Sequence, residues 1–291
     1  MKRIFLFLLT NLAVLLVLSI VAQVTGLSSW LAAQGSGLAP LLVMAALFGF
    51  GGSLISLAIS KWSAKRAMGV RVIEQPANAD EQWLVNTVRN LASQAQIGMP
   101  EVGIFDSPEP NAFATGARRD HALVAVSSGL LRSMNQTQVQ AVLGHEITHV
   151  ANGDMITLSL LQGVVNTFVI VLARVVGGIV DRAISRDGDS RGGIGYFLCV
   201  MVAQLVLGVL ASIIVMWFSR RREFRADAGG AHLAGRNAMI SALEALRSAH
   251  GEALPKQMAA FGIAGGAGSG LQRLFMSHPP LEERIAALKA Q

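Results

Sequence analysis

Charged residues are scarce in this chain of 291 residues. Only 14% of the sequence is Asp, Glu, Lys or Arg, whereas 52% is hydrophobic. The mean hydropathy of +0.50 is high for a soluble protein. Residues 4–60 contain no charged side chain at all, and two further uncharged runs cover residues 155–173 and 192–218. Since a membrane-spanning helix needs about 20 apolar residues, this absence of charge predicts an integral membrane protein.

The uncharged runs have room for four spans, at about residues 4–24, 38–60, 155–180 and 194–218. The first run holds two of them, with a polar hinge at residues 34–37. A cleavable signal peptide is the competing interpretation, because Lys2 and Arg3 precede an apolar stretch. The length of that stretch, and the hydrophobic segment directly after it, favour a retained pair of spans.

Other absences exclude several classes of function. Cys199 is the only cysteine, so an internal disulfide is excluded, and its place inside an apolar span disfavours a reactive thiolate. The sequence has no phosphate-binding Gly-Lys-Ser/Thr loop, which excludes ATP-driven unfolding by this chain. No basic stripe is interleaved with aromatic residues, so the net charge of +6 favours a lipid bilayer over nucleic acid as the partner.

Basic residues predict the orientation of the spans, because they are enriched in cytoplasmic segments. Those at the ends of three spans are Lys2, Arg3, Lys61, Lys65, Arg66, Arg220, Arg221 and Arg222. The loop at residues 181–193 is a mild conflict, since it also holds three arginines. The three basic segments at the span ends outweigh this loop, and they place both termini and both polar regions in the cytoplasm.

The polar regions, 61–154 and 219–291, predict one α+β domain built from two sequence segments. The expected elements are a strand over 69–75, a helix capped by Asp80 and ending near Gln94, strands over 102–105, 111–115 and 123–127, and helices over 237–250 and 281–290. The last two strands form a hairpin across residues 116–120. A further helix starts at Asn135, with Gln138 completing a capping box.

That last helix carries His145-Glu146-Ile147-Thr148-His149. Two histidines four residues apart lie on one helix face and can bind one zinc ion, while the adjacent glutamate can reach a water at the metal. The pattern indicates metal-assisted hydrolysis of a peptide bond. The plain alternative is a pair of unrelated polar residues on a helix surface.

A catalytic zinc site needs a third protein ligand and an open position for water. Glu223 follows span four by five residues and His149 precedes span three by six. If these spans form an antiparallel hairpin, both side chains emerge within about 10 Å of the same membrane face. Asp227 shares the helix face of Glu223 and can accept the free N–H of a zinc-bound histidine. Without the zinc motif, these acids would be read as part of a solvated surface helix.

Four segments resemble the bacterial HtpX family of heat-shock-associated, inner-membrane zinc endopeptidases, which is related to the CAAX prenyl proteases. They are the segments 145–154 (HEITHVANGD), 222–229 (REFRADAG), 111–116 (NAFATG) and 277–280 (SHPP). Weaker similarities at the N-terminus and in residues 163–169 extend the resemblance over essentially the whole chain. Thr148, where Ser is common, and the short glycine-rich loop 181–193 are the departures.

The resemblance implies a mainly α integral membrane protein with four transmembrane helices and a cytoplasmic zincin-like metalloprotease domain. It implies one Zn²⁺ per chain bound by His145, His149 and Glu223, with Glu146 as the catalytic base. Asp227 matches an acid behind the ligands, and His278 a residue near the reacting carbonyl.

By the same resemblance, the substrate-binding strand comprises Asn111, Ala112, Phe113, Ala114 and Thr115. The expected substrates are misfolded or damaged membrane proteins of the bacterial inner membrane, cleaved as part of stress response and quality control. The expected functional partner is an ATP-dependent membrane protease. Without the resemblance, His278 would be read as a turn residue and the strand as an ordinary hairpin strand.

Two other classes of function remain as alternatives. A zinc-binding scaffold or sensor would tolerate loss of Glu146, and a metal transporter would hold its ligands near the membrane midplane. The histidines His121, His232 and His250 lack partners at ligand spacing and are interpreted as surface or packing residues. Arg174, inside span three, either extends to the far interface or pairs within the bundle.

Overall fold

The computed structural model describes residues 37–184, 194–249 and 272–291, with six isolated positions between residues 20 and 32. Lys2, Arg3, His250 and almost all of the predicted span at residues 4–24 lie outside the described residues. The chain divides into two compact units. The first comprises residues 1–56 and 159–215, and the second comprises residues 57–158 and 216–291.

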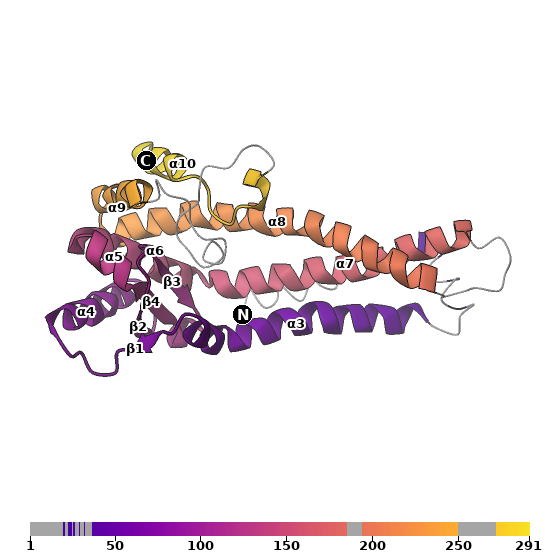
Figure 1. Cartoon of the computed structure of the whole chain (residues 1–291), viewed down its shortest axis with the longest axis horizontal. Coiled ribbons are helices and arrows are strands. Elements are labelled where there is room, and N and C mark those ends of the chain that lie inside the picture. Colours follow the sequence, from indigo (N-terminus) through magenta and orange to yellow (C-terminus); the bar gives the residue numbers. More distant parts are fainter. Residues whose placement is uncertain are drawn as a thin grey trace. The chain divides into compact units, whose positions relative to one another are not determined.

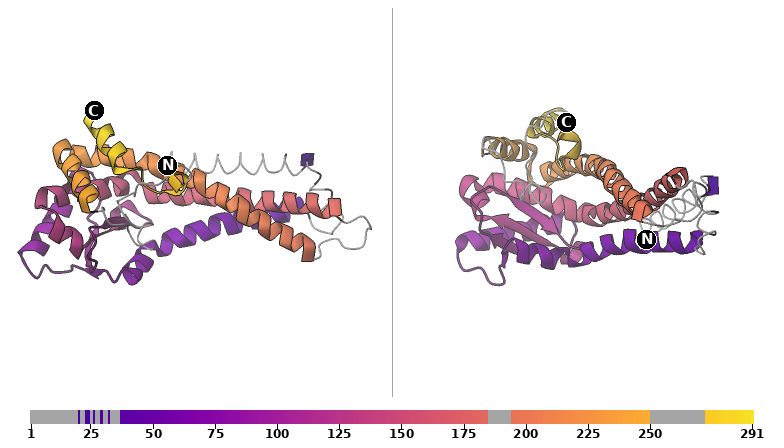
Figure 2. Two further views of the ribbon diagram at one scale, coloured as in Figure 1. Left: turned by 45° about the horizontal axis from the view of Figure 1, so that its top comes forward. Right: turned by 45° about the vertical axis from the view of Figure 1, so that its right-hand side comes forward.

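Three long helices supply the described part of the first unit, and Figure 2 shows them in two views. They are α3 (Leu38–Ala67), α7 (Asp154–Ile184) and α8 (Ile194–Ala234). Each is long and apolar enough to cross a bilayer. This agrees with the sequence predictions at 38–60, 155–180 and 194–218, and α3 and α8 continue well beyond their apolar parts. The chain is therefore a membrane protein with three such helices among its described residues.

Small residues let α3 and α7 approach closely within this unit. A Cβ on Gly49 would overlap the hydroxyl of Thr167, and one on Gly163 would overlap the ring of Phe50. The Thr167 hydroxyl is buried and donates to the Gly163 carbonyl at 2.8 Å. Packing of this kind suits helices in lipid, where close backbone contact replaces the hydrophobic effect as the driving force.

A four-stranded sheet is the centre of the second unit (Figure 1). Its strands are β1 (Arg71–Val72), β2 (Glu101–Phe105), β3 (Ala112–Thr115) and β4 (Leu123–Ser127), in the order β1-β2-β4-β3. Strand β4 is parallel to β2 and antiparallel to β3, which pairs Thr115 with Leu123. The predicted hairpin is confirmed, and β3 lies at one edge of the sheet. The turn within the hairpin is a short 3-10 helix, η1 (Arg119–His121).

Helices complete this unit. They are α4 (Ala79–Gln94), α5 (Ser128–Ser133), α6 (Gln136–Asn152), α9 (Arg236–Ala249), the 3-10 turn η2 (Gln272–Phe275) and α10 (Leu281–Lys289). The apolar faces of α4, α6, α9 and α10 share one core with the sheet. Leu84, Val88 and Leu91 of α4 are fully buried there, at the helical spacing read from the sequence.

Two local predictions were wrong. The cap of α4 is Asn78 rather than Asp80, because the Asn78 side chain accepts from the backbone N–H of Glu81 at 2.8 Å. The expected strand at 69–75 shrinks to the two residues of β1. Gly69 precedes β1 with a φ of 62°, and the chain leaves the sheet after Val72, so only two residues pair with β2.

Ser127, at the end of β4, fixes the start of the edge strand. Its hydroxyl donates to the Glu109 carbonyl at 2.7 Å and accepts from the backbone N–H of Asn111 at 2.9 Å. It also accepts from the N–H of Leu130 at 2.9 Å and so caps α5. Ser127 is fully buried, so these three bonds have no competition from water.

We expect Ser127→Ala to lower the free energy of unfolding of the second unit by about 2 kcal/mol, because it leaves buried polar groups unpaired and removes a helix cap. Denaturant unfolding of the purified protein in detergent measures the change. The control is Ser133→Ala, an exposed serine at the other end of α5, which should shift stability by less than about 0.5 kcal/mol. Equal effects of the two substitutions would contradict this account of Ser127.

Candidate metal centre

Helix α6 is sharply defined at both ends. Asn135 and Gln138 form the capping box that the sequence predicts, with reciprocal bonds of 3.0 and 3.1 Å. Gly153 ends the helix in the left-handed conformation, with a φ of 65°, so that α7 begins at the next residue. Every residue from 141 to 150 is buried, so the His-Glu-Ile-Thr-His motif faces the interior of the second unit.

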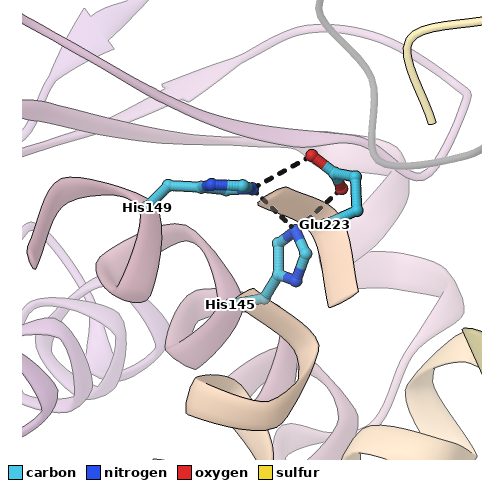
Figure 3. Close-up of side chains that lie close together, drawn as sticks. All are labelled: His145, His149 and Glu223. Atoms are coloured by element: carbon cyan, nitrogen blue, oxygen red, sulfur yellow. Dashed lines mark hydrogen bonds and ion pairs between the residues drawn. The ribbon is translucent and has the colours of Figure 1, made fainter. Parts of the chain in front are cut away.

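Three side chains of this unit converge on one point (Figure 3). The Nε2 atoms of His145 and His149 are 3.1 Å apart. Glu223 of α8 places Oε2 3.4 Å from the His145 Nε2 and Oε1 3.3 Å from the His149 Nε2. Two atoms bound at about 2.1 Å to one tetrahedral ion lie about 3.4 Å apart. The spacing of the three donor atoms therefore fits a single metal ion, and the three residues form a cluster that could hold one.

Glycines bring α8 close enough to α6 for this convergence. The Cβ that a side chain at Gly230 would add lies 3.0 Å from the backbone nitrogen of His145. A Cβ at Gly229 would overlap the side chain of Thr148, and one at Gly144 would contact Gly230. The two helices therefore pack backbone against backbone, and Glu223, less than two turns before the crossing, reaches the histidines.

Two buried carboxylates bind the outer nitrogens of the histidine rings. The Nδ1 atom of His145 lies 2.9 Å from Asp227, which is four residues after Glu223 on α8. The Nδ1 atom of His149 lies 2.7 Å from Asp154, the first residue of α7. These contacts fix the rings with both Nε2 atoms directed at Glu223.

Two buried arginines contact the residues that carry these carboxylates. Arg284 of α10 donates to both oxygens of Asp227, at 2.8 and 2.6 Å, in a bidentate pair. Arg222 donates to the backbone carbonyl of Asp154 at 3.2 Å. The sequence argument missed Arg222, Arg284 and the contact of Asp154 with His149. Asp154 carried a signal, since it is the first acid after the motif. Nothing local marks Arg284, because it is 57 residues from its partner Asp227.

His278 lies beside the same carboxylate. Its Nδ1 atom is 2.8 Å from Oε2 of Glu223, and its side chain keeps 16% of its surface exposed. His278 is thus at the border between the buried cluster and solvent. By contrast, His121 and His232 are exposed, as expected. Arg174 in α7 donates to the carbonyl of Ile170 on its own helix at 3.0 Å.

The charges of the cluster shift its protonation. Burial lowers the pKa of His149, but the charge of Glu223 and the bond to Asp154 outweigh burial and raise this pKa to about 10. Burial raises the pKa of Glu223, but the charges of His278 and His149 hold it well below its usual range. Burial also raises the pKa of Asp227, but Arg284 lowers it to about 2. The raised pKa of His149 and the lowered pKa values of Glu223 and Asp227 all favour positive charge among negative carboxylates.

Glu146 follows a different pattern. It is 5% exposed, and burial raises its pKa, although the charges of His145 and His149 oppose the shift. A carboxylate with a raised pKa is a better proton acceptor than an ordinary surface glutamate. Glu146 therefore combines a place beside His145 with enhanced basicity.

The edge strand β3 ends near the cluster. A small pocket is lined by Thr115 and Gly116 at its end, together with His149, Val150 and Gly153 of α6. Residues 112–114 are buried and Thr115 is partly exposed. Of the predicted strand 111–115, Asn111 is the exception, because it precedes β3.

Comparisons with known proteins agree with this architecture. A model of peptidase family M48 matches residues 78–291. The chain is 64% identical over 290 residues to the protein "Protease HtpX homolog" of Thiobacillus denitrificans, covering 100% of this chain and 99% of that protein. It is also 64% identical to Protease HtpX of Thioalkalivibrio sulfidiphilus over 293 residues, with coverage of 100% and 99%. The crystal structure of S. mikatae Ste24p has a similar fold, with a TM-score of 0.61 at 18% identity, covering 94% of this chain and 67% of that chain.

The fold, the motif and these similarities define a metal-dependent protease of membranes. The full-length similarity to HtpX proteases confirms the resemblance that the sequence motifs indicate. The chain belongs to peptidase family M48.

We expect Gly230→Val to lower metal affinity at least about tenfold, because the added side chain forces α8 away from His145 and carries Glu223 with it. Elemental analysis of the purified protein, with a chelator competition, measures the change. Gly208→Val is the matched control, since a Cβ at that glycine of α8 meets nothing within 4 Å. Unchanged affinity in the Gly230 variant would show that the helix contact does not position Glu223.

Asp154→Ala should weaken metal binding about 10- to 100-fold, because the His149 ring loses the acceptor that orients it. The same chelator competition measures it, and circular dichroism verifies that the variant is folded. Asp80→Ala, which removes an exposed acid of α4, should leave the affinity unchanged. Wild-type affinity in the Asp154 variant would exclude a positioning effect of this carboxylate.

Proposed function

We propose that this protein is a zinc-dependent endopeptidase that cleaves misfolded or damaged membrane proteins at the cytoplasmic face of the bacterial inner membrane. The observation that carries the proposal is the convergence of His145, His149 and Glu223, with donor atoms 3.1 to 3.4 Å apart, beside the buried Glu146. Two imidazoles and one carboxylate are a ligand set found in zinc hydrolases.

In this proposal His145, His149 and Glu223 hold one zinc ion, and Asp227 and Asp154 fix the orientation of the two rings. When bound, zinc acts as a Lewis acid that acidifies a water and polarises the substrate carbonyl. Three protein ligands leave a tetrahedral ion one open position. The buried, hydrogen-bonded surroundings of the ligands keep that geometry rigid.

Glu146 is proposed as the general base. It takes the proton of the attacking water as the carbonyl carbon is attacked, and it then delivers this proton to the leaving amine nitrogen. The raised pKa of Glu146 supports both steps, since the carboxylate accepts the proton readily and returns it at the end. His278 is proposed to stabilise the reacting carbonyl, from its partly exposed place beside Glu223.

Strand β3 is proposed to bind the substrate backbone. Because it lies at an edge of the sheet, an extended peptide can add to it as a further strand. The small pocket at Thr115, next to His149, supports this assignment because it links the end of β3 to the ligands. Asn111 stands just before the strand and is held there by Ser127, so it is proposed to contact the substrate as well.

The proposed location rests on charge and on the relatives. Basic residues follow the apolar parts of α3 and α8, which favours a cytoplasmic position for the second unit and the chain termini. A fourth span at residues 4–24 completes the proposed topology. Membrane proteins as substrates and a functional link to an ATP-dependent membrane protease are proposed from the sequence resemblance. The absence of a phosphate-binding Gly-Lys-Ser/Thr loop from this sequence is in keeping with such a partner.

We expect Glu146→Gln to retain one zinc ion per chain and to lose at least about 100-fold in proteolytic rate, because the ligands persist while the proton acceptor is removed. Elemental analysis and cleavage of a membrane-protein substrate in detergent measure the two properties. Glu244→Gln, at a half-buried glutamate of α9 that pairs with Lys289, is the control and should keep wild-type activity. Chelation of the wild type should abolish cleavage, and added zinc should restore it.

Undiminished cleavage by the Glu146 variant would refute the proposed mechanism. Stoichiometric zinc without cleavage in the wild type would instead favour a zinc-binding scaffold or sensor.

A further inference from the structure

Two tryptophans of the second unit have the same arrangement. Trp62 on α3 and Trp217 on α8 each precede an arginine by one helical turn, Arg66 and Arg221 respectively. The guanidinium carbons lie 5.9 Å and 5.3 Å from the indole centroids, within the range of a cation–π contact. Both indoles are largely exposed, at 64% for Trp62 and 53% for Trp217.

Both pairs stand at the boundary between apolar and basic sequence. On α3, charge first appears at Lys61, and on α8 it first appears at Arg220. The preceding turns of these helices expose large hydrophobic side chains, among them Ile55, Ile59 and Ile214. Tryptophan is enriched at this boundary in membrane proteins, because its ring has an apolar body and one polar N–H.

The two arginines are available to a ligand. Within the part of the chain that the structure describes, neither Arg66 nor Arg221 contacts a carboxylate. The neighbouring basic residues already have partners within the protein. Lys61 and Lys65 both pair with Glu101, and Arg222 is buried at the metal centre. Each free guanidinium is stacked on an indole and keeps N–H groups in the fork that suits a phosphate.

We propose that the pairs Trp62–Arg66 and Trp217–Arg221 bind the phosphates of anionic phospholipid headgroups. The indoles then lie among the glycerol groups and the guanidiniums in the phosphate layer. This inference rests on the proposed membrane location, and it names the ligand and the residues that recognise it. Charge complementarity selects anionic over zwitterionic lipids, because no carboxylate among the described residues forms an ion pair with either arginine.

The contact sets the height of the metal centre above the bilayer. Glu223 follows Trp217 by six residues of one helix, which is about 9 Å along its axis. On the other side, Lys61 donates to the carbonyl of His121 at 3.1 Å and thereby ties the β3–β4 turn to the level of Trp62. The Thr115 end of the proposed substrate strand therefore lies near the headgroups, and cleavage is expected a few residues outside a substrate's span.

Tryptophan quenching by brominated lipids tests the proposal. The chain has four tryptophans, so Phe replaces the other three to leave Trp62, Trp83 or Trp217 alone. Each full-length variant is placed in nanodiscs that contain phosphatidylcholine and phosphatidylglycerol, with bromine on the acyl chains of one lipid at a time. We expect quenching of Trp62 and Trp217 and none of Trp83, which is partly buried against the core of the second unit.

The difference in quenching between the two brominated lipids decides the proposal. At equal lipid content, brominated phosphatidylglycerol should be favoured over brominated phosphatidylcholine by about fivefold at each site, the equivalent of about 1 kcal/mol per arginine. Arg66→Gln should remove the preference for phosphatidylglycerol at Trp62. Arg221→Gln should remove the same preference at Trp217. Arg89→Gln, an exposed arginine of α4, should change neither.

Equal quenching by the two lipids would overturn the selection of anionic headgroups, because phosphatidylcholine carries a phosphate as well. Absence of quenching at both tryptophans would overturn the lipid contact altogether. Zinc content and Glu146-dependent proteolysis are measured on the same nanodiscs. They verify that each variant is folded, and they separate a failure of this inference from a failure of the proposed protease function.

Discussion

A carboxylate buried in the second unit governs the whole site. Glu223 is 1% exposed, and an unpaired charge at such a place would cost several kcal/mol. Positive groups surround it accordingly, since His145, His149 and His278 all lie within 3.4 Å and Arg284 lies 3.8 Å away. A bound cation offers the same compensation. The arrangement is therefore stable only while positive charge, from protons or from metal, occupies the space between the histidines and the glutamate.

The compensation extends outward in alternating shells of charge. The histidines bind Glu223 with one nitrogen and a second carboxylate with the other. Arg284 binds the carboxylate of Asp227, and Arg222 binds the backbone carbonyl of Asp154. Each layer removes a degree of freedom from the layer inside it, so the donor atoms keep their spacing. The same layers draw in segments from distant parts of the sequence, because α6, α7, α8 and α10 each contribute at least one member.

Sequence reasoning reached the inner layer of this site for identifiable reasons. The spacing of His145 and His149 is a local property of one helix, and Glu223 followed from the position of its helix next to an apolar run. The capping box at Asn135 and the β3–β4 hairpin were also local and were confirmed. The contacts of Arg222 and Arg284 depend on how helices pack in three dimensions, and no spacing in the sequence encodes that packing.

The local errors have equally local causes. Asn78 and Asp80 are both good helix caps, and the choice between them depends on where the chain leaves β1, which the pattern of residues does not reveal. The glycines at 144, 229 and 230 carried no signal as isolated residues. Their importance appears only when α6 and α8 are placed side by side, where a Cβ at Gly229 would overlap Thr148 and one at Gly230 would crowd the backbone of His145.

The position of Arg284 in the sequence sets the order in which the parts of the site are synthesised. It follows His145, the histidine that it supports through Asp227, by 139 residues. Because synthesis runs from the N-terminus, a nascent polypeptide acquires both imidazoles and Glu223 well before its last helix emerges. The outer layer around His145 is therefore completed only after its inner ligands have been synthesised.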